Sequence, residues 1–143
     1  MTYVRLTLVA VSLLAAFLLG VWLTQPAFPV DRKFVAMSLN GDSLLKDGAR
    51  LAPTFTATRH STISFGAAGS SGCNQWAADL VLTGTRWIAL RKVHSTAVVC
   101  PGKMEIEEKF ARALPNVTRW RREGGILILE NDTDVLRFLL APR

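Results

Sequence analysis

The chain has 143 residues, half of them hydrophobic, and a formal net charge of +6 at neutral pH. Behind the first 30 residues roughly 113 remain, enough for one domain with its own core and hardly for two. That part is still rich in Val, Ile, Leu, Phe and Trp, so the composition excludes a disordered chain.

Residues 6–23 form an uncharged run whose only polar members are Thr7 and Ser12. A helix of this length nearly spans a bilayer, and the run lacks the polar residues at helical spacing that a buried core helix needs. Residues 1–24 are therefore expected to be a signal peptide or a transmembrane signal anchor. Because no A-x-A pattern marks a cleavage site, an uncleaved anchor is favoured over cleavage and release into the periplasm or cell exterior.

The part behind this run is predicted to be mainly β with one helix (α+β). A linker with two prolines covers residues 25–33, and a domain covers residues 34–141. β-branched and aromatic runs between Gly- and Asn-rich turns predict strands. The expected strands are residues 34–39, 54–58, 62–65, 80–82, 86–90, 118–122, 126–130 and 135–140. The small residues 66–72 are expected to form a loop.

Residues 103–114 are predicted to form the helix. Ile106, Phe110, Ala113 and Leu114 recur at helical spacing and make a stripe for the core. On the outer side, the pairs 105/109 and 108/112 place an acid four residues before a base. Pro115 then ends the helix, because proline disfavours helical geometry at the preceding residue.

Cys73 and Cys100 are the only cysteines. An even count in an exported chain predicts one disulfide, which would close a loop of about 28 residues. The alternative is a pair of free buried thiols that pack as small apolar residues. A disulfide would place the domain outside the cytoplasm.

Catalytic and cofactor sites are not expected. The glycines of residues 66–72 lack the dinucleotide-binding spacing and no Gly-Lys-Ser/Thr follows them, so they do not indicate a phosphate loop. His60 and His94 lack the paired spacing of a zinc site, so no metal is expected. Ser95 and Cys100 near His94 leave a hydrolase as the least favoured possibility, because a disulfide would consume the thiol.

The densest basic cluster is RWRR at residues 119–122. Such a cluster could meet lipid phosphates or nucleic acid, but a solvated strand surface beside a turn is the favoured interpretation. Export argues further against nucleic acid, so no nucleic-acid partner is expected.

Three stretches resemble the META domain, the family of the heat-shock protein HslJ. GSSGCNQW at residues 69–76 is similar to the family's G-x-x-G-C-N box. HSTAVVC at residues 94–100, with the Met, Glu, Phe and Leu that follow, is similar to its second-cysteine segment. VTRWRREGGILILEN at residues 117–131 resembles its closing strand pair, and FVAMSLNGDSL at residues 34–44 resembles its opening strand.

This chain departs from the family pattern at two places. Phe34 stands where the family usually has Trp, and Ala97, Val98 and Val99 replace the usual Arg-Met-Ala before the second cysteine. No polar role is therefore carried over to the missing Arg position.

The resemblance implies a small, mostly antiparallel, barrel-like sheet with one helix, commonly on an envelope protein, and no enzymatic activity is established for the family. Members of the family are linked to heat shock and novobiocin resistance, so a role in stress or antibiotic tolerance through protein or ligand contacts is expected. The expected working surface joins residues 66–74 to residues 94–101. Its candidate binding residues are Gly72, Asn74, His94 and Thr96.

The alternative function is binding of a small apolar ligand inside the barrel. An interior filled by aromatic side chains would count against it. The side chains expected to fill the interior are those of Phe55, Phe65, Trp76, Trp87 and Phe138.

Overall fold

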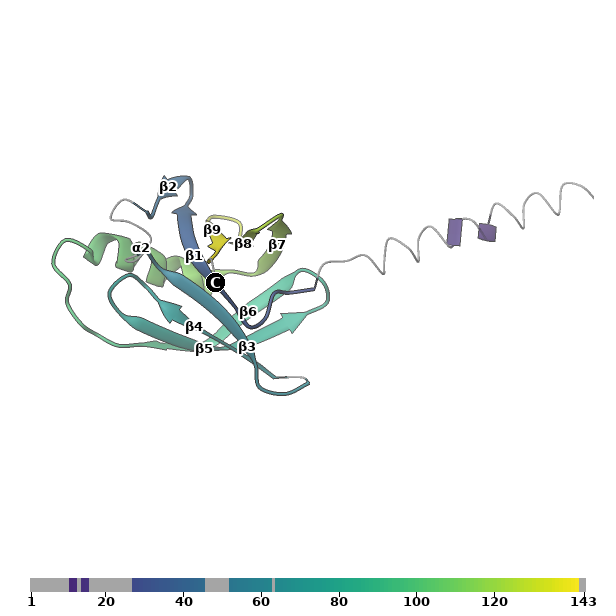
Figure 1. Cartoon of the computed structure of the whole chain (residues 1–143), viewed down its shortest axis with the longest axis horizontal. Coiled ribbons are helices and arrows are strands. Elements are labelled where there is room, and N and C mark those ends of the chain that lie inside the picture. The colour runs from purple at the N-terminus through teal and green to yellow at the C-terminus, as the bar shows by residue number, and fades with distance from the viewer. Residues whose placement is uncertain (1–10, 13, 16–26, 46–51, 63, 142–143) are drawn as a thin grey trace, which may run out of the picture.

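The computed structural model describes residues 11, 12, 14, 15, 27–45, 52–62 and 64–141 (Figure 1). Most of the apolar run at residues 6–23 lies outside this set. Among the described residues, no helix combines the length and apolar character of a membrane span.

Nine strands, one α-helix and one 3-10 turn make up the described domain. In chain order they are β1 Arg32–Leu39, β2 Asp42–Ser43, β3 Thr54–Arg59, β4 Phe65–Ser70, β5 Gln75–Thr83, β6 Trp87–Ser95, α2 Met104–Ala113, η1 Leu114–Asn116, β7 Arg119–Glu123, β8 Ile126–Glu130 and β9 Val135–Leu140.

The strands form one antiparallel sheet that closes on itself. Its order is β2-β1-β3-β4-β5-β6-β7-β8-β9, and β1 also pairs with β9. The narrowest seam joins β6 to β7 through the single register pair of Trp87 with Arg119. Between these two strands the chain leaves the sheet and forms α2, which lies beside one end of the ring (Figure 1). The mainly antiparallel sheet with one helix is the predicted fold.

Aromatic side chains fill the interior of the ring. Phe55, Phe110 and Phe138 are fully buried, and the centroid of the Phe55 ring lies 5.8 Å from those of Trp76 and Phe138. Phe28, from the expected linker, is also buried, and its ring centroid lies 4.9 Å from that of Trp120. The chain therefore enters the domain through a buried aromatic contact.

Trp87 was expected inside and this prediction is wrong. Its side chain is 55% exposed, because Ile88 and Leu90 are the inward residues of β6 and strand alternation turns Trp87 outward. Phe65 is only partly buried and packs against the core.

Residues 66–70 of the predicted loop belong to the strand β4. Of the strand predicted at residues 62–65, Thr62 and Ser64 lie in the turn before β4, Phe65 begins β4, and residue 63 lies outside the described residues. Small residues here serve close packing rather than flexibility. A Cβ on Gly69 would lie 1.9 Å from the Thr54 carbonyl oxygen of β3. That same oxygen accepts a hydrogen bond from Trp76 Nε1 at 3.3 Å. Glycine is therefore required where β3, β4 and β5 approach each other.

The helix and the apolar strand β8 follow their predictions. Phe110 and Ala113 are buried, and Lys109 and Arg112 pair with the acids four residues before them at 2.8 and 3.1 Å. In β8, residues 127–129 are fully buried. Ile128 lies between Arg121 of β7 and Arg137 of β9 in the register, so its outward side chain is covered as well.

Candidate functional site

The turn between β4 and β5 begins the candidate site. Gly72 has a φ of +110°, a conformation that favours glycine, and its N–H donates to Ser70 Oγ at 3.0 Å. Ser71 is buried, and both its N–H and its hydroxyl donate to the Asn74 carbonyl oxygen, at 2.8 and 3.1 Å. These bonds aim the Asn74 side chain at the segment that follows β6.

A disulfide between Cys73 and Cys100 joins this turn to that segment, as predicted. The two Cα atoms lie 6.0 Å apart, within the range that a disulfide spans without backbone movement. Cys100 therefore supplies no thiolate, which removes the cysteine version of the hydrolase.

The Asn74 carboxamide uses all four of its hydrogen-bonding positions. Its Oδ1 accepts from Thr96 Oγ1 at 2.8 Å and from the Val98 N–H at 2.6 Å. Its Nδ2 donates to the Val98 carbonyl oxygen at 3.0 Å and to Glu107 Oε1. Asn74 is only 3% exposed, so these bonds form away from water. The side chain holds the backbone of residues 96–98 in place.

Thr96 also connects the start of β5 to the segment that follows β6. Its Oγ1 accepts from the Gln75 N–H at 3.1 Å, and its own N–H donates to the Gln75 carbonyl oxygen at 3.0 Å. Three of the four predicted binding residues, Gly72, Asn74 and Thr96, thus lie together. The hydrogen bonds given above hold the turn at residues 70–74 against residues 96–98.

Glu107 of α2 is a member of the site that sequence reasoning missed. It is 8% exposed, and its Oε2 has no hydrogen-bond partner among the described residues. The signal was its spacing, because Glu107 precedes Phe110 and Leu114 by three and seven residues and so shares their inward stripe.

Exposed apolar side chains lie on the segment held by Asn74 and at the start of α2. Val98 is 58% exposed, Val99 75% and Met104 41%, and these three residues are called the apolar tip. The Val98 backbone is fixed by two bonds to Asn74 while its side chain faces solvent. Two adjacent exposed apolar side chains, Val98 and Val99, on a backbone fixed by hydrogen bonds make this segment the candidate contact site.

His94, the fourth predicted residue, lies on the outer face of β6. It is exposed, and its Nδ1 lies 3.1 Å from the Lys92 carbonyl oxygen. With His60 it lines a shallow hollow of about 300 Å³ over small residues of β4 and β5. The described residues hold no group of three or more His, Cys, Asp or Glu side chains suited to a metal ion.

Two grooves flank α2. One of about 350 Å³ lies against β6 and is lined mainly by apolar side chains, including Trp76, Phe110 and Leu114, and His94 is also among its lining residues. The other, of about 490 Å³, separates α2 from the turn between β1 and β2 and is lined largely by polar residues such as Asp42, Lys109 and Asp134.

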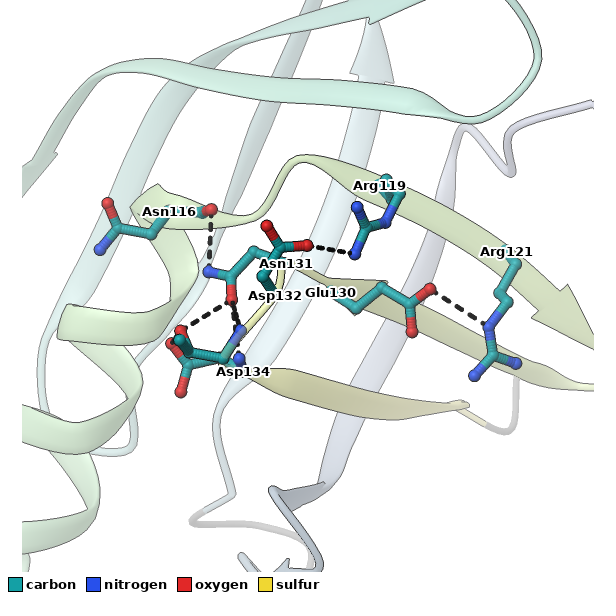
Figure 2. Close-up of polar contacts among 8 residues, drawn as sticks. Asn116, Arg119, Arg121, Glu130, Asn131, Asp132 and Asp134 are labelled. Carbon is teal, nitrogen blue, oxygen red and sulfur yellow. Dashed lines mark hydrogen bonds and ion pairs between the residues drawn. The ribbon is translucent and has the colours of Figure 1, made fainter.

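A second asparagine fixes the turn between β8 and β9 (Figure 2). Asn131 Oδ1 accepts from the N–H groups of Thr133 and Asp134, each at 2.7 Å, and its Nδ2 donates to the Asn116 carbonyl oxygen at 3.0 Å. Arg119 pairs with Asp132 at 2.9 Å beside it. This network joins η1 to the closing strands and has a structural role.

A closed antiparallel sheet, one helix between β6 and β7, and a G-x-x-G-C-N turn bonded to a second cysteine together define a class of small β-rich domain. The META domain family model matches residues 30–143, and the chain belongs to the META domain family.

Solved structures agree in fold. A protein from Burkholderia xenovorans, determined by NMR, has 21% sequence identity and a TM-score of 0.62, over 80% of this chain and 84% of its own. A second NMR structure has 19% identity and a TM-score of 0.55, over 76% of this chain and 88% of its own. The curated proteins include no match to this chain.

Proposed function

We propose that this META domain is a non-enzymatic envelope protein that binds a protein partner through the apolar tip. The exposure of Val98 and Val99 on a backbone pinned by Asn74 and the disulfide carries this proposal. A partner with an apolar pocket would bury these side chains at little cost in conformational entropy, because the segment is already ordered.

The same proposal includes a location. The run at residues 6–23 anchors the chain in a membrane, and the domain lies on the oxidising side, where the Cys73–Cys100 disulfide persists. The physiological setting is stress or antibiotic tolerance, on the strength of family membership alone.

A complementation experiment tests the role. A strain lacking the gene is challenged with heat and with novobiocin, and is supplied with the native chain, a Val98→Ser/Val99→Ser variant, or a Leu139→Ser control. Leu139 is 46% exposed on β9, so its loss removes a similar apolar side chain elsewhere. The native chain and the control should restore survival and the double variant should not, at equal protein levels.

Two outcomes would contradict the proposal. Full rescue by the double variant would overturn the role of the apolar tip. Unchanged survival of the strain lacking the gene would overturn the tolerance setting.

A second candidate function is binding of a small apolar ligand. The interior is filled by aromatic rings, which counts against a site inside the ring. The groove of about 350 Å³ between β6 and α2 offers Trp76, Phe110 and Leu114 instead, and its volume is within the range of small-molecule sites. Quenching of tryptophan fluorescence by apolar probes, lost on Ala111→Phe substitution in the groove, would favour this function.

A further inference from the structure

The two ends of the sheet differ in charge. One end, called the entry end, is where residues 27–31 join the sheet and where β1 begins, β3 ends, β6 begins and β7 ends. The opposite end, called the helix end, carries α2 and the apolar tip; in Figure 1 these two ends lie at the right and the left of the domain.

Basic residues predominate at the entry end. Among the described residues there, two are acidic, Asp31 and Glu123. The basic ones are Arg32, Lys33, Arg59, Arg86, Arg121 and Arg122. The helix end is closer to neutral. It carries the acids Asp42, Glu105, Glu108, Asp132 and Asp134. Three of these acids pair with Lys109, Arg112 and Arg119, and Lys103 lies beside them.

An exposed tryptophan accompanies these cations. Trp87 is 55% exposed at the start of β6, directly after Arg86 and opposite Arg119 in the register. Tryptophan beside arginine is the combination that suits a membrane interface, where the indole lies among the headgroups and the guanidinium groups meet phosphate.

The length of chain ahead of the domain limits where this end can lie. Phe28 is held in the core by Trp120 and Phe55, with ring centroids 4.9 and 6.3 Å away. Four residues lie between Leu23, the end of the apolar run, and Phe28, and the five Cα–Cα steps that join these two residues span at most about 18 Å when fully extended. A bilayer that holds residues 6–23 must therefore lie close to the entry end.

We propose that the entry end docks on the bilayer surface through anionic phospholipid headgroups, with Trp87, Arg86 and Arg122 in contact with lipid. This inference rests on the proposed membrane anchor. It gives the anchored domain one orientation, with the basic entry end against the lipid and the apolar tip pointing away, available to a partner outside the membrane.

The test uses the full chain in lipid nanodiscs that contain a gadolinium-chelating headgroup lipid. Amide NMR signals close to the lipid lose intensity. Signals from residues 83–87 and 122–126 should be lost, while those from residues 105–112 should be retained. This difference in signal loss between the entry end and α2 is called the contrast. It should be larger in discs of phosphatidylcholine with phosphatidylglycerol than in discs of phosphatidylcholine alone, and it should become smaller at high salt.

Charge reversal supplies the matched comparison. An Arg86→Glu/Arg122→Glu variant should lose the contrast, whereas Arg91→Glu/Lys103→Glu, which reverses two cations away from the entry end, should keep it. Trp87→Ala should weaken the contrast without changing the fold, because the side chain is exposed.

The two proposals fail in different ways. A chain that elutes with the discs but shows equal signal loss at both ends, or greater loss in α2, overturns the docking face and leaves the anchor intact. A chain that does not elute with the discs overturns the anchor and the docking face together.

Discussion

Asn74 Oδ1 accepts a hydrogen bond from the Val98 N–H at 2.6 Å, and Asn74 Nδ2 returns one to the Val98 carbonyl oxygen at 3.0 Å. One buried side chain on the β4–β5 turn thereby fixes both backbone groups of a residue 24 positions away. The geometry of the apolar tip depends on this pair, and its consequences can be measured.

Asn74→Ala should lower the free energy of unfolding by about 2–3 kcal/mol, because it leaves the buried Glu107 carboxylate and the Val98 backbone without partners. Urea unfolding measures the change. Asn116→Ala is the matched control, since the Asn116 amide donates at an exposed position to Arg112 O, and it should stay within about 0.5 kcal/mol. If the two variants lowered the free energy of unfolding equally, the buried hydrogen bonds of Asn74 would not have the stabilising role described.

Removing the disulfide with Cys73→Ser/Cys100→Ser should cost roughly 3–4 kcal/mol on the chain-entropy model for a separation of 27 residues. Amide hydrogen exchange should also accelerate more at residues 96–99 than in β8, because this segment is then held by its hydrogen bonds alone and no longer by the disulfide. Unfolding curves that coincide with and without reductant in the native chain would contradict this expectation.

Gly69→Ala should destabilise the domain by about 3 kcal/mol, because its Cβ would overlap the Thr54 carbonyl oxygen and force β3 and β4 apart. Gly125→Ala is the control, since a Cβ there meets nothing within 4 Å. Thermal unfolding of the two variants should separate clearly. A tolerated Gly69→Ala would mean that β4 is not packed as described.

Lys109 has a pKa raised above its usual 10.5, first by the hydrogen bond from its ammonium to Glu105 and then by the charge of that carboxylate. A raised pKa means that the pair contributes to stability below pH 10.5 and that the contribution is lost as the pH rises through the folded pKa. An NMR titration of the Lys109 side chain should return to the ordinary value in Glu105→Gln. An unchanged titration in that variant would assign the shift to another group.

Much of the fold could be predicted because the turns have distinctive chemistry. Gly84 and Gly124, both with positive φ, mark two hairpins, and the helix follows from the spacing of Phe110 and Ala113. The strand β4 could not be predicted, because its glycines and alanines are typical of a loop. The contact of Gly69 with Thr54, which explains them, exists only once β3 lies alongside.

The site was predictable in part for a similar reason. The cysteine count indicated the disulfide, and the G-x-x-G-C-N resemblance indicated Gly72 and Asn74. Glu107 was missed because a carboxylate on an apolar stripe has meaning only with the Asn74 amide opposite it. Trp87 was assigned to the interior because its large apolar area favours burial, whereas the register of β6 turns it outward.

Photocrosslinking in native membranes tests the role of the apolar tip most directly. Benzoylphenylalanine replaces Val99 in one variant and Leu139 in a control, since both side chains are exposed and lie at different places on the domain. The proposed function predicts a discrete adduct with one protein from position 99, absent from position 139 and lost when Val98→Ser is added. No adduct from position 99, or the same adducts from both positions, would contradict it.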